Sequence, residues 1–122
     1  MSVKLLVKSF SHAFRGIAYT ARHEQNFRVE LAASLLVVLF GFLFRIVSID
    51  WIIVLFLIAF VLVLELFNTV FERFIDMVKP RYHIEVKQIK DMLAAAVTIG
   101  AICAATIGLI IFWPYVELFF LK

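Results

Sequence analysis

The chain has 122 residues, of which 65% are hydrophobic and only 17% are charged. Soluble domains average roughly 45–50% apolar and roughly 25% charged residues. A short chain of this composition has too few polar side chains to cover a soluble core, which excludes an ordinary soluble enzyme, a nucleic-acid-binding module and a disordered tail. The formal net charge is +3, from 12 basic and 9 acidic residues, so the positions of the charges matter more than their sum.

Residues 3–24 are predicted to form an amphipathic helix. Val3, Val7, Phe10 and Phe14 recur with helical spacing, and lysine and arginine side chains occupy the opposite side. Such a helix is typical of the membrane interface, where its apolar face enters the lipid and its cations meet anionic head groups.

Three apolar segments, at about 29–47, 51–78 and 90–113, are predicted to cross a membrane as helices. The second has 14 consecutive apolar residues from Trp51 to Leu64. Because a span needs ~20 residues, this helix must continue through the polar residues that follow. The chain is therefore predicted to be an all-α membrane protein, with residues 1–122 forming one domain.

The third span has two features of its own. Small residues recur at steps of four along one face, which favours close packing against another helix. The motif Trp113-Pro114-Tyr115 is expected to mark the end of the span at the interface. The small residues are Ala96, Gly100, Ala104 and Gly108.

The distribution of Lys and Arg predicts the orientation of the spans. Five basic residues precede the first span, five lie between the second and third, and only two fall on the opposite side. By the positive-inside rule, the N-terminus and residues 73–90 face the cytoplasm and the C-terminus faces outward.

Polar residues in the second predicted span lie on one helical face. Taking 100° per residue, they fall within an arc of about 100° over more than three turns. An ionised group at mid-bilayer costs about 2.5–3.5 kcal/mol, so the stripe must face protein, water or a cation. The residues of this polar stripe are Glu65, Asn68, Thr69, Glu72 and Asp76.

Several interpretations of the polar stripe compete. It could pair with Arg28 or Lys90 between helices, form a proton or ion path, or bind a cation. Mg²⁺ favours one or two carboxylates together with water and substrate phosphates. Glu24 and Lys90-Asp91 are predicted on the same cytoplasmic side, where a phosphate donor and a lipid head group can meet. The sequence contains neither the P-loop nor the glycine-rich loop of protein kinases.

The segment at residues 65–76 resembles the signature of the small bacterial diacylglycerol kinase/undecaprenol kinase family, approximately E-[LI]-[LIV]-N-[ST]-A-[IL]-E-x-x-[VI]-D. Two other family motifs are matched by Glu24-x-x-Phe27-Arg28 and by Lys90-Asp91 with the alanines that follow, so the resemblance covers nearly the whole chain. The chain is more similar to the undecaprenol kinases of Gram-positive bacteria in Lys8-Ser9-Phe10, Arg15-Gly16-Ile17, Thr20-Ala21-Arg22 and the segment 107–112.

This resemblance implies a kinase of the bacterial cytoplasmic (inner) membrane that transfers the γ-phosphate of ATP to a lipid alcohol. Undecaprenol is the expected acceptor, and diacylglycerol is the alternative. The resemblance further implies a homotrimer in which each chain has three spanning helices and a surface helix. Active sites on the cytoplasmic side are shared between neighbouring protomers, and Mg²⁺ is the expected cofactor.

The resemblance also implies roles for individual residues. Glu65 is the general base that takes the proton from the lipid hydroxyl, and Glu24 and Glu72 hold Mg²⁺ with the nucleotide. Lys90 neutralises the transferring phosphate, while Asn68 and Asp91 orient groups in the same site. The remaining implied contacts are Arg81, Tyr82, His83 and His12 for the nucleotide, and Arg28 and Asp76, with Glu65, for the lipid.

Three departures from the family pattern keep alternatives open. Val70, Phe71 and Leu93 stand where smaller residues are expected, and larger side chains between facing helices reshape their packing. A family member acting on another lipid alcohol is therefore one alternative. A non-catalytic transporter or assembly protein is another, because it explains the spans and the polar stripe without Glu24 or Lys90-Asp91.

Overall fold

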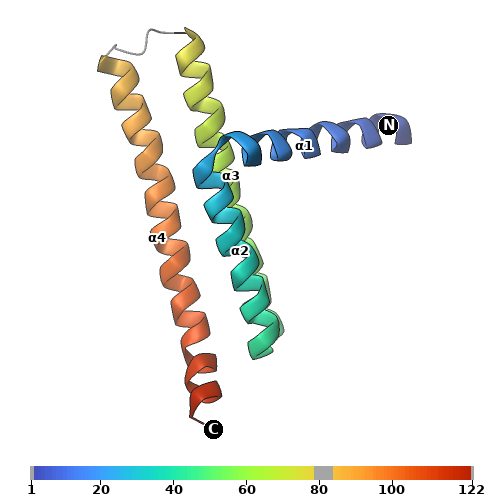
Figure 1. Cartoon of the computed structure of the whole chain (residues 1–122), viewed down its shortest axis with the longest axis vertical. Coiled ribbons are helices and arrows are strands. Elements are labelled where there is room, and N and C mark those ends of the chain that lie inside the picture. The colour runs from blue at the N-terminus through green and yellow to red at the C-terminus, as the bar shows by residue number, and fades with distance from the viewer. Residues whose placement is uncertain (1, 79–83, 122) are drawn as a thin grey trace.

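The computed structural model describes residues 2–78 and 84–121, which form four α-helices. α2 (Gln25–Phe44), α3 (Ser48–Val78) and α4 (Ile84–Phe120) run alongside one another, and α4 packs mainly against α3. α1 (Val3–His23) leaves this bundle at a steep angle (Figure 1). α3 and α4 continue past the level at which α1 joins (Figure 1), so α1 meets the bundle partway along its length.

The three helices of the bundle have the length and composition of membrane spans. α2 has 20 residues, α3 has 31 and α4 has 37, and all three are apolar enough to cross a bilayer. The sequence-based prediction of an all-α, multi-pass membrane protein is therefore confirmed.

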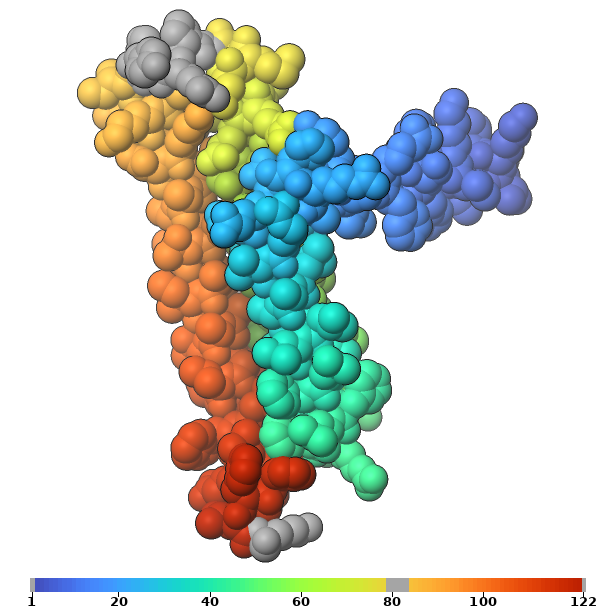
Figure 2. Space-filling view, in the orientation of Figure 1, coloured from blue at the N-terminus to red at the C-terminus, as the bar shows by residue number. Residues whose placement is uncertain are grey.

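Most large apolar side chains lie on the outside of the described chain. The buried apolar residues in it are Phe27, Ile46, Val54 and Val86. A surface of this kind suits lipid tails or another membrane helix, both of which are as apolar as the side chains themselves. The space-filling view shows α1 standing clear of the bundle, so most of its surface is exposed (Figure 2).

The turn between α1 and α2 is centred on Glu24. Its backbone is extended, and its N–H donates to the carbonyl of Thr20 at 2.8 Å. The Arg28 guanidinium donates to the carbonyls of Ala21 and Arg22, each at 3.0 Å. These carbonyls lie in the last turn of α1 and have no partner within the helix, so Arg28 acts as its C-terminal cap. Glu24 is thereby held at a defined corner.

Glycine allows α2 to approach α3 closely. A Cβ added at Gly41 would lie 2.6 Å from the indole ring of Trp51, so no larger residue fits without moving the ring. The chain then reverses at Arg45, whose φ of 53° and ψ of 52° are left-handed. This left-handed C-cap ends α2 and starts the short link to α3.

The predicted small-residue face of α4 is used against α3 at Gly100. A Cβ there would lie 2.5 Å from Cδ1 of Leu64, and Gly100 is buried. Ala104 and Gly108 instead line a cavity between the helices. Gly100 therefore allows close packing against α3, whereas Ala104 and Gly108 leave space between the helices.

α4 is longer than the predicted span of 90–113. Pro114 lies inside the helix, which therefore continues beyond the residues expected to mark the end of the span. A contact distant in sequence accompanies the extension, because the Tyr115 hydroxyl donates to Asp50 at 2.6 Å and accepts the N–H of Val47 at 3.1 Å. The extended helix is thereby tied to the beginning of α3.

Candidate active site

The polar stripe of α3 turns toward the protein rather than outward. Glu65 is only 2% exposed and Thr69 is 6% exposed. Asn68 and Glu72 are half-buried, whereas Asp76, close to the end of α3, is exposed. The part of the stripe from Glu65 to Glu72 therefore faces protein, as the cost of an ionised group in a membrane requires.

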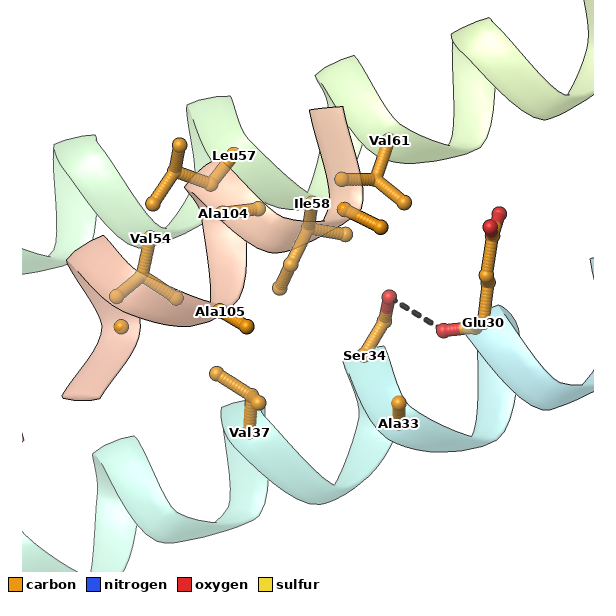
Figure 3. A pocket seen from close by; sticks show the side chains of 12 residues that line it. Glu30, Ala33, Ser34, Val37, Val54, Leu57, Ile58, Val61, Ala104 and Ala105 are labelled. Atoms are coloured by element: carbon orange, nitrogen blue, oxygen red, sulfur yellow. Dashed lines mark hydrogen bonds between the residues drawn. The ribbon is translucent and has the colours of Figure 1, made fainter. Parts of the chain in front are cut away.

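Glu30 of α2 interacts with this stripe, although it was not among the site residues predicted from the sequence. The carboxylates of Glu30 and Glu65 interact electrostatically, and Figure 3 shows the Glu30 side chain pointing from α2 toward α3. The available signal was Glu30 with Ser34, a polar pair one turn apart on an otherwise apolar segment. Such a pair inside a span indicates a face turned away from lipid.

Four carboxylates thus converge from two helices and one turn. Glu65 also interacts electrostatically with Glu72 on its own helix and with Glu24 at the corner between α1 and α2. We refer to Glu24, Glu30, Glu65 and Glu72 as the carboxylate group. Carboxylates that interact in this way repel one another when ionised, so the group favours a bound cation or proton.

Several buried polar atoms near this group lack a hydrogen-bond partner in the described residues. An unpaired buried acceptor or donor costs about 1–3 kcal/mol, and such atoms call for a specific explanation. A ligand that supplies a hydroxyl hydrogen would satisfy one of the acceptors. The atoms are Glu30 Oε2, Glu65 Oε2, Asn68 Oδ1 and Thr69 Oγ1.

An apolar cavity of about 270 Å³ opens beside Glu30, between α2, α3 and α4. Ser34 on its wall donates to the backbone carbonyl of Glu30 at 2.7 Å, so its hydroxyl is satisfied within α2 (Figure 3). The rest of the lining is aliphatic or glycine. The cavity therefore offers a hydrocarbon chain an apolar wall next to a carboxylate.

Arg73 of α3 connects the carboxylate group to α1. Its guanidinium lies 3.2 Å from Glu24 Oε1 and donates to the Tyr19 hydroxyl at 2.5 Å. It also lies over the Tyr19 ring, 4.8 Å from the centroid, and this ring stacks on His23. Glu24 therefore carries a cationic partner in this structure.

The Lys90 ammonium binds the C-terminal end of the polar stripe. It lies 2.6 Å from Asp76 Oδ1, which joins α4 to α3. Lys90 therefore pairs with the polar stripe, as one of the sequence-based interpretations proposed, and its partner there is Asp76. Asp91 is exposed, and its ion pair is with Lys87 one turn away at 3.7 Å.

The other predicted residues are not gathered with the carboxylate group in one chain. His12 lies on the exposed part of α1, 12 residues before Glu24 and so about 18 Å along the helix. Arg28 is engaged in capping α1. The predicted nucleotide contacts Arg81, Tyr82 and His83 lie outside the described residues.

Glu24 and Glu72 have the donor chemistry that Mg²⁺ requires. Mg²⁺ takes oxygen ligands and is commonly held by one or two carboxylates with waters and substrate phosphates. In the described part of the chain, no group of three or more His, Cys, Asp or Glu side chains has metal-binding geometry. Two carboxylates completed by nucleotide phosphates remain compatible with this arrangement.

A family model for prokaryotic diacylglycerol kinase matches residues 11–112. The chain belongs to this family of membrane lipid kinases, which confirms the resemblance and the kinase class predicted from the sequence. Membership also favours a kinase over the non-catalytic transporter or assembly protein.

Individual relatives point in the same direction. An undecaprenol kinase of Bacillus subtilis is 43% identical over 107 residues, which cover 88% of this chain and 87% of the relative. A diacylglycerol kinase of Synechocystis is 32% identical over 104 residues, covering 84% of this chain and 59% of the relative. A diacylglycerol kinase of Escherichia coli K12 is 26% identical over 110 residues, covering 90% of each.

Proposed function

We propose that this protein transfers the γ-phosphate of ATP to undecaprenol within the bacterial cytoplasmic membrane. The observation that carries this proposal is the Glu65 carboxylate, which is 2% exposed and has an unpartnered oxygen beside Glu24 and Glu72. A buried acceptor next to two candidate metal ligands suits an enzyme that removes a proton from a lipid hydroxyl while it binds a nucleotide. The 43% identity to an undecaprenol kinase supports this acceptor.

Glu65 acts as the general base in this proposal. Its free Oε2 accepts the proton of the lipid hydroxyl, and the hydroxyl oxygen attacks the γ-phosphorus of ATP. The bond from this phosphorus to the β-phosphate oxygen breaks, and ADP leaves. Asn68, one turn further along α3, has a buried Oδ1 without a partner and helps to orient the hydroxyl. The apolar cavity beside Glu30 accommodates part of the hydrocarbon chain. Arg28 and Asp76 complete the surroundings of the lipid.

Glu24 and Glu72 hold Mg²⁺ together with the nucleotide phosphates. When bound, the ion neutralises charge on the transferring phosphoryl group, the main requirement of this chemistry. Glu24 lies in the turn between α1 and α2, whereas Glu72 lies on α3. The distance between the two carboxylates therefore depends on how this turn packs against α3.

The nucleotide is proposed to lie at the end of the bundle where α3 ends and α4 begins. Lys90 leaves Asp76 to contact the transferring phosphate, and Asp91 orients groups beside it. Arg81, Tyr82, His83 and His12 contact the rest of the nucleotide. A flexible ammonium group suits Lys90 to this exchange of partners.

The whole chain, residues 1–122, is proposed to be one membrane domain. α1 lies in the interface with its apolar face in the lipid and its basic face toward the cytoplasm. The N-terminus and the active site are cytoplasmic by the positive-inside rule. Three chains assemble into a homotrimer in which neighbouring protomers complete each active site.

The test is phosphoryl transfer by the purified protein in detergent or lipid, with ATP, Mg²⁺ and one lipid alcohol at a time. We expect undecaprenol to be phosphorylated faster than diacylglycerol, the acceptor named for the Synechocystis and Escherichia coli relatives. Faster transfer to diacylglycerol would show that undecaprenol is not the preferred acceptor, but the proposal of phosphoryl transfer from ATP to a lipid alcohol would stand. Transfer to neither, under conditions in which a related kinase is active, would refute the proposed function.

A further inference from the structure

Arg73 is held in an unusual position for a residue not yet given a role in the reaction. It follows Glu72 on α3, and its guanidinium reaches across to the other proposed metal ligand, Glu24, at 3.2 Å. Tyr19 fixes this orientation, both through its hydroxyl and through its ring. One proposed metal ligand, Glu24, is therefore paired with a cation that follows the other, Glu72, in the sequence.

The charge balance of the site makes this cation significant. In the described part of the chain, the ion pair made by the carboxylate group is that of Glu24 with Arg73. A divalent ion at Glu24 places a second cation on this carboxylate, and the repulsion between the two cations weakens the ion pair with Arg73. Binding of the metal therefore favours release of the guanidinium from Glu24.

The released guanidinium has a suitable new partner. ATP with Mg²⁺ keeps a net negative charge on its phosphates, and the planar fork of arginine matches phosphate oxygens well. The Arg73 side chain is 44% exposed, so a nucleotide can reach it, and stacking on Tyr19 keeps it near the carboxylate group.

We propose that Arg73 is a phosphate-binding residue that exchanges its ion pair with Glu24 for the nucleotide phosphates when the metal–nucleotide complex binds. This inference rests on the proposed function, because it assumes that Glu24 is a metal ligand in a nucleotide site. It predicts opposite effects of Arg73 on two ligands. Arg73 competes with the free metal ion at Glu24, but it attracts the metal–nucleotide complex.

The experiment measures binding rather than turnover. Mn²⁺ replaces Mg²⁺, and electron paramagnetic resonance reports free Mn²⁺ in titrations of the purified protein, with and without a non-hydrolysable ATP analogue. In Arg73→Gln, Mn²⁺ alone should bind at least as tightly as in the wild type. The Mn²⁺–nucleotide complex should bind roughly tenfold more weakly, the loss expected for one charge-assisted contact.

Two further variants make the outcome specific. Arg15→Gln removes the same charge from α1, where Arg15 bonds to Ser11 of its own helix at 3.3 Å, and both affinities should stay at wild-type values. Arg73→Lys keeps the charge but loses the fork, so both affinities should lie between those of the wild type and the Gln variant. The Lys variant also provides the test if the Gln variant does not assemble.

The other outcomes overturn the inference. Loss of both affinities would give Arg73 a purely structural role, and gain of both would make it only a competitor of the metal. No change in either would remove Arg73 from the site. If the wild type binds neither Mn²⁺ nor the nucleotide analogue, the proposed function itself fails, so the two failures are distinguishable.

Discussion

At the scale of single residues, the site depends on acidic side chains buried among apolar helices. Glu65 is 2% exposed, and the carboxylates of Glu30, Glu72 and Glu24 act on it electrostatically. A membrane helix tolerates such a concentration of negative charge only where a proton, a cation or a ligand balances it. The energetic cost of these residues is therefore itself evidence for a binding site.

Replacing Glu65 with Gln should stop turnover and preserve binding. The amide has nearly the shape of the carboxylate but cannot accept the hydroxyl proton, so kcat should fall by roughly 10²–10⁴-fold. Affinity for the Mn²⁺–nucleotide complex should stay within a few-fold of the wild type. Glu117→Gln, at an exposed position near the far end of α4, is the matched control and should retain full activity. Full activity in Glu65→Gln would remove Glu65 from the role of base.

Replacing Glu72 with Gln should act on the metal instead. Even partners that only support metal ligands contribute roughly 10–100-fold in metal affinity, so loss of a ligand should raise the half-saturating Mg²⁺ concentration by at least roughly tenfold. The measurement is initial rate against Mg²⁺ at saturating ATP and lipid. An unchanged Mg²⁺ dependence would show that Glu72 is not a ligand.

The sequence alone was sufficient to predict part of this site. Glu65, Asn68 and Glu72 share a helical face, and the period of one helix gives that directly. Glu30 was missed because its proximity to Glu65 depends on how α2 packs against α3, which periodicity does not describe. The contact of Arg73 with Glu24 has the same origin, since these residues are 49 positions apart in the chain.

At the scale of helices, glycines determine how closely the spans pack. Gly41 faces the indole of Trp51, and Gly100 faces Leu64. The row of small residues that contains Gly100 was predictable from its spacing. The role of Gly41 was not, because it depends on the contact with Trp51 of another helix. The continuation of α4 beyond Pro114 was likewise unpredictable locally, because the Tyr115 contact with Asp50 joins residues 65 positions apart.

Gly41→Ala should destabilise the packing of α2 on α3. The new Cβ would lie 2.6 Å from a rigid aromatic ring, which must move or force the helices apart. Overpacking of this kind costs about 1–3 kcal/mol. The measurement is thermal unfolding followed by circular dichroism in detergent, in which the midpoint should fall.

Gly16→Ala is the matched control for this substitution. A Cβ at Gly16 has no neighbour within 4 Å, and alanine favours a helix over glycine by about 1 kcal/mol. Its unfolding midpoint should stay the same or rise. Equal midpoints for the two variants would contradict the steric role of Gly41.

At the scale of the whole molecule, one chain gathers only part of the proposed site. Glu24, Glu65 and Glu72 interact within the chain, whereas the Asp91 side chain is 70% exposed and its ion pair is with Lys87 on its own helix. A neighbouring protomer that supplies Asp91 would complete the site. The proposed homotrimer therefore predicts that two inactive variants can restore activity together when their substitutions lie in parts of the site that come from different protomers.

Mixed trimers of two inactive variants test this division. Glu65→Gln and Asp91→Asn chains, each with its own affinity tag, are co-expressed, and trimers that carry both tags are purified. A site that takes Glu65 from one protomer and Asp91 from the next can be intact in such trimers. Each single variant should be inactive. The doubly tagged trimers should regain about one third of wild-type activity, because a ring of three chains that contains both variants has one head-to-tail interface in three that joins an intact Glu65 to an intact Asp91.

The control pair uses residues that the structure places together in one chain. Glu65 and Glu72 lie two turns apart on α3, so both belong to the same protomer's contribution. Mixed trimers of Glu65→Gln and Glu72→Gln should therefore stay inactive, because every site lacks one of the two carboxylates. Recovery in the first mixture but not in the second would assign the carboxylates to one protomer and Asp91 to its neighbour. Recovery in neither mixture would show that Asp91 acts in the chain that carries Glu65, and the shared-site arrangement would have to be abandoned.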